Sequence, residues 1–580
     1  MLERSSEIVV DATGPAADAI DEHVQRLVAD EVASRIAAKD ATLWGPRAQE
    51  EAAKRLGWVD LHRTSRALIG EVETLADRYA RRGCDRVVLC GMGGSSLAPE
   101  VIAGTARKEL VVCDSSDPSM VAAAIGSPQD LARTVVVVSS KSGSTAETDS
   151  QRRAFVDAFT EAGLEPTEHM VVVTDPGSPL DEVTRADGYD VVNADPEVGG
   201  RYSALTAFGL VPSALAGVDV AALLDEAEAV ADVLALDDDG NPALRLGAVL
   251  AGQAEQVGQA GESAAPRRDV LVITEAGTWI RGLGDWAEQL IAESTGKEGT
   301  GVLPVVDVPA TLGQEPLAHV WADCPDVTIA RIIGDEVDER DDDLEGEDAQ
   351  PVDTDHPAAV VNVGGSLGAH FLLWETATAV AGYLLGINPF DQPDVESAKE
   401  AAREQMSGEG TAAAAPVFTA SEVEVRSPGA DFLGDAASVR QAVQALLAQV
   451  GPSGYLAVMS YVDRWAHADE AAPAQEALAR ATGRPVTIGW GPRFLHSTGQ
   501  FHKGGPADGV YLQVTRAVPE DRDLGVPGKD FTLGELLAAQ ATGDAQVLAG
   551  LDRPVLRLHA LTDAGYAAVV EALQHPENGA

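Results

Sequence analysis

The sequence predicts an α/β protein in which parallel sheets are flanked by helices. The first observation is a series of continuous, valine-rich apolar runs, such as DRVVLCG (85–91) and RTVVVVSS (133–140). Strands of a parallel sheet are covered on both faces, so their apolar residues are continuous rather than alternating. The second observation is that helix-compatible stretches separate these runs. The third is that turns rich in glycine or serine follow them.

The length of 580 residues predicts several folded units, because a domain usually has about 100–200 residues. Apolar residues make up 45% and charged residues 23% of the chain, as in globular proteins. We expect four parts: a helical segment over 1–80, a first α/β domain over 81–235, a second over 236–407 and a carboxyl-terminal α/β segment over 408–580 that completes the second unit.

The strands are expected in the following order. The first domain has four, at 85–96, 109–118, 133–145 and 169–178. The second has two clear strands and then a long apolar helix, at 269–277, 325–334 and 366–386. The last segment has three, at 453–462, 484–490 and 509–515. We interpret the acidic run 335–348 as a solvated loop.

The charge excludes some partners. The chain has 92 acidic and 42 basic residues and a formal charge of −50. Such a surface repels nucleic acids and anionic membranes, so neither is expected as a partner. High salt screens the repulsion within an acidic protein, so a salt-rich cytoplasm is a hypothesis for the setting of this chain.

The sequence also predicts a cytoplasmic protein. MLERSSEIVV has no long apolar stretch, so no signal peptide is expected. The apolar stretch 205–218 is too short to span a membrane. The four cysteines form no paired framework and are interpreted as reduced thiols.

The turn GMGGSS (91–96) is the first candidate binding motif. It follows a strand and precedes a helix-compatible segment, where backbone amides and the helix dipole favour an anion. Gly91, Gly93 and Asp114 also fit part of a dinucleotide fingerprint. A plain strand-to-helix turn explains the motif equally well.

The second candidate is SSKSGSTAET (139–148), which again joins a strand to a helix. Five hydroxyl side chains lie within seven residues of the strand end. Serine and threonine often cap a helix, but five hydroxyls exceed what one cap needs. Two such turns on nearby strands favour a compact sugar phosphate over a dinucleotide.

These two turns together resemble the sugar-isomerase (SIS) domain of phosphosugar isomerases. Three further segments resemble the glucose-6-phosphate isomerase family, and more closely the isomerase half of fused transaldolase–isomerase proteins: EVGGRYSALTAFGL (197–210), EQLIAESTGKEG (288–299) and GYLLGINPFDQPDVESAKEAA (382–402). The resemblance implies two SIS-type sandwiches and reversible isomerisation of glucose 6-phosphate and fructose 6-phosphate through a cis-enediol(ate). No cofactor or metal is implied, and a homodimer is expected because family members are commonly dimers.

The resemblance also implies roles for individual residues. Glu293 matches the base that moves the proton, Arg201 the cation at the enediolate, and Lys399 the lysine near the ring oxygen. The implied substrate contacts are Gly94, Ser95, Ser140, Lys141, Ser142, Thr145 and Gln289. Each charged residue also has a simpler, structural interpretation. In that case Glu293 pairs with Lys297 on the surface, Arg201 holds its own turn, and Lys399 forms a surface ion pair.

The catalytic histidine has no match at the family's usual place in the chain order. The family has it between the glutamate and lysine segments, where this chain has His319, His356 and His370 in unrelated contexts. RFLHSTGQFHKGG (493–505) resembles the family's histidine segment but follows Lys399. It nominates His496 with Gln500 nearby, and His502 is the second candidate.

Three other functions are kept as alternatives. An isomerase of mannose 6-phosphate, or of both sugars, needs the same fold, since small pocket contacts decide the configuration at C2. A phosphosugar-binding regulator needs the two turns but not Glu293. A nicotinamide-dependent dehydrogenase depends on Gly91, Gly93 and Asp114 alone.

Overall fold

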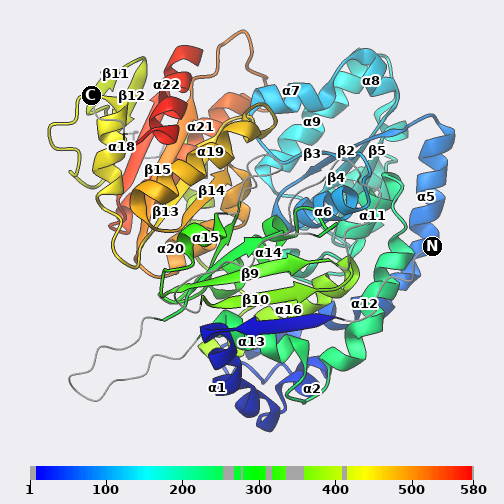
Figure 1. Ribbon diagram of the computed structural model, residues 1–580. Coiled ribbons are helices and arrows are strands. Elements are labelled where there is room, and N and C mark those ends of the chain that lie inside the picture. The colour runs from blue at the N-terminus through cyan, green and yellow to red at the C-terminus, as the bar shows by residue number, and fades with distance from the viewer. Residues whose placement is uncertain are drawn as a thin grey trace, which may run out of the picture.

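The structure is a computed structural model that describes residues 8–252, 267–275, 278–307, 317–334, 358–407 and 414–577. These residues form three sheets of five, five and six strands. In Figure 1 the first sheet (blue to cyan) and the third sheet (yellow to red) stand side by side above the second sheet (green). The acidic run 335–348 and His356 lie outside the described residues.

The first sheet contains the four strands predicted for the first domain and one more, β6. Its strands lie parallel in the order β3-β2-β4-β5-β6. Val135 and Val137 pack into one hydrophobic core, whereas Val136 and Val138 pack into another, so the apolar run is buried on both faces as predicted. The strands are β2 (Arg86–Gly91), β3 (Val111–Cys113), β4 (Thr134–Ser139), β5 (Met170–Thr174) and β6 (Asp190–Asn193). The helices of this part are η3 (Gly93–Ser95), α6 (Leu97–Thr105), α7 (Pro118–Ile125), α8 (Pro128–Ala132), α9 (Ala146–Glu161), η4 (Pro166–Glu168) and α10 (Pro179–Ala186).

The strand order brings the two candidate turns together. Strand β2 lies between β3 and β4, so the direction of chain progression reverses at the β2–β4 pair. Gly91 and Ser139, the last residues of these strands, are partners in the register. Open α/β sheets bind ligands at such a reversal, beyond the carboxyl ends of the strands. The fold therefore places both turns at one crevice.

The second sheet has the order β1-β10-β9-β7-β8. Its edge strand β1 comes from the amino-terminal segment, for which only helices were expected, and pairs antiparallel with β10. The strands are β1 (Val9–Thr13), β7 (Val270–Thr274), β8 (Leu303–Val306), β9 (Val327–Ile333) and β10 (Val360–Gly364). The amino-terminal helices are α1 (Pro15–Ala29), α2 (Val32–Ala37), α3 (Gln49–Arg55), η1 (Gly57–Asp60), α4 (Leu61–Thr64), η2 (Ser65–Leu68) and α5 (Ile69–Arg81). The other helices are η5 (Gly200–Tyr202), α11 (Ala207–Leu215), α12 (Val220–Leu234), α13 (Pro242–Ala251), α14 (Leu283–Thr295), α15 (Ala318–Trp321), α16 (Leu367–Leu385) and α17 (Val395–Ser407).

The third sheet has the order β11-β12-β16-β15-β13-β14. It does not extend the second sheet, but Val272 and Ile329 of the second sheet share a hydrophobic core with Leu512 of the third, which completes the second unit by packing. The strands are β11 (Phe418–Ala420), β12 (Val423–Arg426), β13 (Tyr455–Tyr461), β14 (Val486–Trp490), β15 (Gly509–Arg516) and β16 (Val555–Ala560). The helices are α18 (Val439–Leu447), α19 (Arg464–Thr482), η6 (Arg493–His496), α20 (Gly499–Gly504), α21 (Leu533–Gly550) and α22 (Asp563–Gln574).

All three sheets share one local strand order. In each, the first strand of the parallel set lies between the second and the third, as β7 does between β8 and β9 and β13 between β14 and β15. The predicted α/β class is therefore confirmed. The domain limits at residues 80, 235 and 407 stay a prediction. None of the helices within the described ranges is both long and apolar enough to cross a membrane.

Candidate active site

The GMGGSS turn packs directly against two other predicted segments. A Cβ atom added at Gly94 would lie 1.9 Å from the carbonyl oxygen of Gly200, so only glycine fits beside the turn that carries Arg201. Gly93 has a φ of +53°, and a Cβ atom there would lie 2.8 Å from the carbonyl oxygen of His496. The half-buried Ser95 ends the short helix η3 of this turn. The first turn thus touches the arginine segment and the histidine segment.

The hydroxyls and two of the amides of the second turn bond to one another at the start of helix α9. The Ser140 hydroxyl accepts from the amide of Gly143 at 3.2 Å, and the exposed Ser142 hydroxyl bonds to Ser144 at 2.8 Å. Thr145 occupies the N-cap of α9, yet its side chain makes no capping hydrogen bond. Capping therefore does not account for this hydroxyl, and the start of a long helix remains available as an anion site.

Lys141 extends from the same turn. Its Nζ atom lies 2.8 Å from Asp175 Oδ2 and donates to the carbonyl oxygen of Pro196 at 3.4 Å. The turn therefore carries a cation that is oriented by a carboxylate.

Helix α14 carries Gln289 and Glu293 one turn apart, as the spacing predicts. Glu293 is 7% exposed, and its Oε2 atom lies 3.3 Å from Arg201 Nη1. Gln289 is buried as well, and its Nε2 atom donates to the carbonyl oxygen of His496 at 2.7 Å. The interpretation of Glu293 as a surface carboxylate is wrong, because the side chain is buried.

Every N–H group of Arg201 has a partner in this structure. Nε donates to Ser294 Oγ at 2.7 Å, and Nη2 donates to the carbonyl oxygens of Pro389 at 2.7 Å and Asp391 at 3.1 Å. Nη1 donates to Glu293 and, at 2.9 Å, to Gln392 Oε1. An Arg that served only to hold its own turn would not need these distant partners. The guanidinium fastens α14 to the loop before α17.

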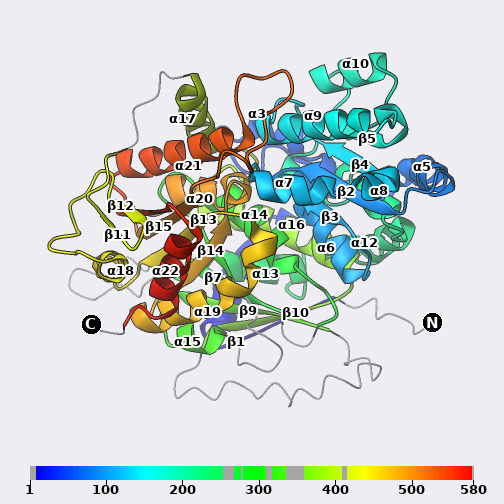
Figure 2. The same ribbon diagram turned by 90° about the horizontal axis from the view of Figure 1, so that it is seen from above.

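Lys297 also binds the loop before α17. Its Nζ atom donates to the carbonyl oxygen of Asn388 at 2.8 Å and lies 2.8 Å from Asp391 Oδ1. It is 1% exposed, and burial lowers its pKa to about 8. The loop leads into α17, which carries the exposed Lys399 and lies along α21 (Figure 2).

Three other predicted catalytic residues influence the pKa of the Glu293 carboxyl. Burial raises the pKa of this carboxyl, and the charge of Arg201 offsets part of the rise. The charges of His496 and Lys399 act in the same direction as that of Arg201. A buried carboxyl whose pKa is raised toward neutrality is suited to accept and return a proton.

His496 is paired with a carboxylate that the sequence analysis did not single out. Its Nε2 atom lies 3.0 Å from Oε1 of Glu147, in the first turn of α9. Gln540 Nε2 donates to the same oxygen at 2.7 Å, and Ser116 Oγ fixes the orientation of Gln540 by donating to its Oε1 at 2.7 Å. Burial opposes ionisation of Glu147, but the charge and hydrogen bond of His496 outweigh it and lower the pKa. An ionised carboxylate therefore orients the imidazole.

Two other histidine candidates, His502 and His370, are not placed for chemistry. His502 is 2% exposed, packs among Tyr455, Phe494 and Tyr511, and has a pKa well below its usual value because of burial. His370 is fully buried in α16, and burial lowers its pKa to about 3. Both are neutral packing residues.

Gln500 braces the site within the protein. Its Nε2 atom donates to the carbonyl oxygen of Gly296 at 2.8 Å and to Asp394 Oδ2 at 2.7 Å, and its Oε1 atom accepts from the amide of Asp394 at 2.9 Å. It is fully buried. Gln500 therefore joins the end of α14 to the segment before α17, and its contact with substrate stays a prediction.

Two other possible sites do not compete with this one. Asp114 is 1% exposed and paired with Arg464 and Arg493, so the dinucleotide interpretation loses its ribose-binding carboxylate. Within the described ranges, no group of three or more His, Cys, Asp and Glu residues is arranged to hold a metal ion.

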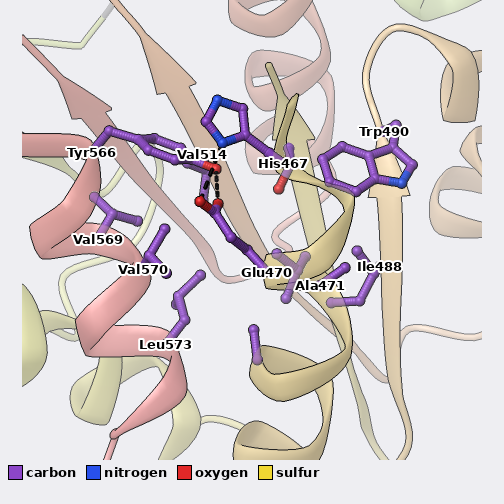
Figure 3. A pocket seen from close by; sticks show the side chains of 13 residues that line it. His467, Glu470, Ala471, Ile488, Trp490, Val514, Tyr566, Val569, Val570 and Leu573 are labelled. Atoms are coloured by element: carbon purple, nitrogen blue, oxygen red, sulfur yellow. Dashed lines mark hydrogen bonds and ion pairs between the residues drawn. The ribbon is translucent and has the colours of Figure 1, made fainter. Parts of the chain in front are cut away.

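A pocket lies elsewhere, over the third sheet between α19 and α22 (Figure 3). It encloses about 390 Å³, including space open to solvent, and its walls are mainly apolar. Among its polar groups is Glu470, which accepts from Tyr566 at 2.7 Å and lies 3.3 Å from His467. None of the predicted site residues lines it, so we do not place the sugar phosphate there.

Comparison with known proteins identifies the family of the chain. The sequence profile of the phosphoglucose isomerase family matches residues 61–237. A probable glucose-6-phosphate isomerase of Haloarcula marismortui is 30% identical over 434 residues, which cover 69% of this chain and 95% of the relative. The chain belongs to the phosphoglucose isomerase family.

Two further comparisons agree with the phosphoglucose isomerase family and with the fold. A glucose-6-phosphate isomerase of Rubrobacter xylanophilus is 30% identical over 401 residues, which cover 61% of this chain and 90% of the relative. The crystal structure of a hypothetical protein from Thermus thermophilus superimposes with a TM-score of 0.55 at 24% identity, covering 69% of this chain and all of that one.

Proposed function

We propose that this protein is a glucose-6-phosphate isomerase, which converts glucose 6-phosphate and fructose 6-phosphate into one another. The observation that carries the proposal is the buried Glu293 carboxyl, whose Oε2 atom lies 3.3 Å from Arg201 Nη1. A phosphosugar-binding regulator needs the two hydroxyl-rich turns but has no use for a buried proton acceptor.

The phosphate group is bound at the two turns. The Ser140, Ser142 and Thr145 hydroxyls and the start of α9 supply donors, and Lys141 supplies charge. Gly94 and Ser95 close the opposite side of the crevice, because their turn begins at the neighbouring strand. This end of the molecule anchors the sugar and thereby fixes the position of its reacting carbons.

Ring opening requires a proton to move between the ring oxygen and the hydroxyl on C1. His496 is the group for this step, since the Glu147 carboxylate, 3.0 Å from its Nε2 atom, orients the imidazole. Lys399 supplies positive charge near the ring oxygen. The open-chain aldehyde is then available to the base.

Isomerisation moves a proton between C2 and C1. Glu293 takes the proton from C2 and returns it to C1, while the proton of the C2 hydroxyl passes to the carbonyl oxygen on C1. Negative charge develops on that oxygen, and Arg201 stabilises it. Because all five N–H groups of Arg201 are already used, the sugar oxygen must replace one acceptor, and the exposed Gln392 is the one that solvent reaches.

Family resemblance and chemistry support two further proposals about setting. We propose a homodimer, which sedimentation of the purified protein tests. We propose a cytoplasmic location, consistent with the free, buried thiols of Cys84, Cys90, Cys113 and Cys324.

The direct test is turnover by the purified protein. Fructose 6-phosphate should form from glucose 6-phosphate, and a parallel assay with mannose 6-phosphate measures the specificity at C2. Binding of both sugars without turnover of either would contradict the proposal and favour a regulator. Turnover of mannose 6-phosphate alone would contradict the assignment of the substrate.

A further inference from the structure

A ring of four ion-paired side chains lies beside the active site and joins three parts of the chain. It consists of Glu100, Asp114, Arg464 and Arg493, and we call it the ion-pair ring. Arg493 Nη1 lies 2.6 Å from Glu100 Oε2 and 2.7 Å from Asp114 Oδ2. Arg464 reaches the other oxygen of each carboxylate, at 2.8 Å for Glu100 and 3.1 Å for Asp114. Each carboxylate therefore binds both guanidinium groups.

The ring is shielded enough to have structural consequences. The side chains of Asp114, Arg493 and Arg464 are 1%, 11% and 17% exposed, and that of Glu100 is 31% exposed. Ion pairs on open surfaces contribute little, whereas breaking a buried pair leaves a charge without a partner. The other carboxylate that faces Arg493 is Asp285 of α14, whose Oδ2 atom lies 3.7 Å from Nη2. The ring thus has a fixed geometry.

The two arginines hold different elements. Arg464 is the first residue of α19, far along the chain from the catalytic groups. Arg493 begins the short helix η6, which ends at His496. Side chains three residues apart eclipse one another in a 3₁₀-helix. Accordingly, Arg493 and His496 both face the first domain, one toward the ion-pair ring and the other toward Glu147.

The carboxylates also belong to the active-site framework. Glu100 lies in α6, directly after the GMGGSS turn, and Asp285 lies in the same helix as Gln289 and Glu293. Ser497, next to His496, donates to Glu288 of that helix at 2.9 Å. The histidine turn is therefore fastened to the phosphate-binding domain and to the helix of the catalytic base at once.

We propose that Arg493 is a positioning residue for His496, and that its ion pairs with Glu100 and Asp114 hold the histidine turn where the imidazole reaches the sugar. Arg493 touches neither sugar nor phosphate in this account. It acts through His496, and Arg464 stabilises the same ring without acting on the histidine. The inference rests on the proposed function.

The test compares Arg493→Met with Arg464→Met in the full chain. Both remove one guanidinium from the same two carboxylates, so both should lower the melting temperature. Arg493→Met should lower kcat about ten-fold or more with KM within about two-fold, and Arg464→Met should leave kcat within about two-fold. Equal losses of kcat in both variants would mean that the ring is only structural and would overturn the inference.

A double variant separates positioning from general damage. In a His496→Asn background, Arg493→Met should change kcat by less than about two-fold, because the group on which it acts is already gone. The same fractional loss with and without the imidazole would overturn the inference. If Arg493→Met does not fold, Arg493→Lys replaces it, since lysine keeps the charge but is shorter and lacks the second nitrogen, Nη2, that faces Asp285. That variant should show an intermediate kcat, and full kcat would contradict the role.

The activity of the unaltered protein distinguishes failure of the proposed function from failure of this inference. If it does not isomerise glucose 6-phosphate, the proposed function fails and this inference fails with it. If it is active while both arginine variants behave alike, only this inference fails.

Discussion

The pair formed by Glu147 and His496 yields the most specific prediction, because the structure isolates its charge. Glu147→Gln keeps the size and shape of the side chain. His496 Nε2 and Gln540 Nε2 both approach the same oxygen, Oε1, at 3.0 and 2.7 Å. Ser116 keeps the amide of Gln540 turned toward that oxygen. A glutamine at 147 therefore presents its carbonyl oxygen to both partners, and only the negative charge is lost.

The magnitude follows from the contact. Two unit charges 3.0 Å apart attract by about 5.5 kcal/mol at an effective dielectric constant of about 20, which is a ceiling. Hydrogen bonds to charged groups contribute about 1.5–3 kcal/mol net. At 1.36 kcal/mol per factor of ten, loss of the charge should lower kcat by about 10- to 150-fold. KM should change little, because Glu147 lies behind His496 rather than at the phosphate.

The assay is steady-state formation of fructose 6-phosphate from glucose 6-phosphate. Glu161→Gln is the control, since Glu161 is an exposed residue at the other end of the same helix. It should have the activity of the unaltered protein. A kcat for Glu147→Gln within about two-fold of that value, or a loss confined to KM, would refute the reasoning that the carboxylate supports the imidazolium.

Further predictions concern the base, a second carboxyl and the surface charge. Glu293→Gln should lower kcat by about 10²- to 10⁴-fold. It should not lower the melting temperature, because burial raises the pKa of this carboxyl and a neutral amide suits the buried position. A fall in melting temperature together with the fall in kcat would contradict this. For the same reason the acid limb of kcat/KM against pH should lie above the ordinary carboxyl value of 4.5. Burial and nearby Asp285 raise the pKa of Glu288 to about 8. The stability that protonated Glu288 contributes is fully present below the ordinary carboxyl pKa of 4.5 and is lost progressively until the pH passes about 8, so Glu288→Gln should flatten the fall in melting temperature between about pH 4.5 and about pH 8. With a net charge of −50, the unfolding midpoint should be higher in molar potassium chloride than in dilute buffer, and equal midpoints would count against a salt-adapted surface.

Much of the sheet framework was predictable because its strands are buried on both faces. The run VVVV at 135–138 has no polar position that would mark a solvent-facing side, and alternate residues of it pack into two different cores. Shorter strands could not be predicted in this way. Strand β8 has four residues and contains Pro304, and the edge strand β1 has five residues with exposed positions among them. Such short strands depend on a neighbour found elsewhere in the chain.

The sequence was enough to predict which segments form the active site, but not which of their residues contact one another. Glu293, Arg201 and the two hydroxyl-rich turns lie in motifs that the sequence displays, and the fold brings them together. Glu147 also lies within the quoted SSKSGSTAET turn, but an acidic residue in the first turn of a helix is common for reasons of the dipole alone. Its role depends on a partner 349 residues away in the sequence. The same holds for Arg493, whose carboxylates come from distant parts of the chain.

The account depends most on proton transfer by Glu293, and a solvent-label experiment tests that step directly. Fructose 6-phosphate is converted by the unaltered protein in deuterium oxide, and the glucose 6-phosphate formed is examined at C2 by proton NMR. A carboxylate that carries the proton exchanges it with solvent, so deuterium should appear at C2, and Glu293→Gln should abolish both turnover and labelling. Turnover or labelling that persists in Glu293→Gln would contradict the account.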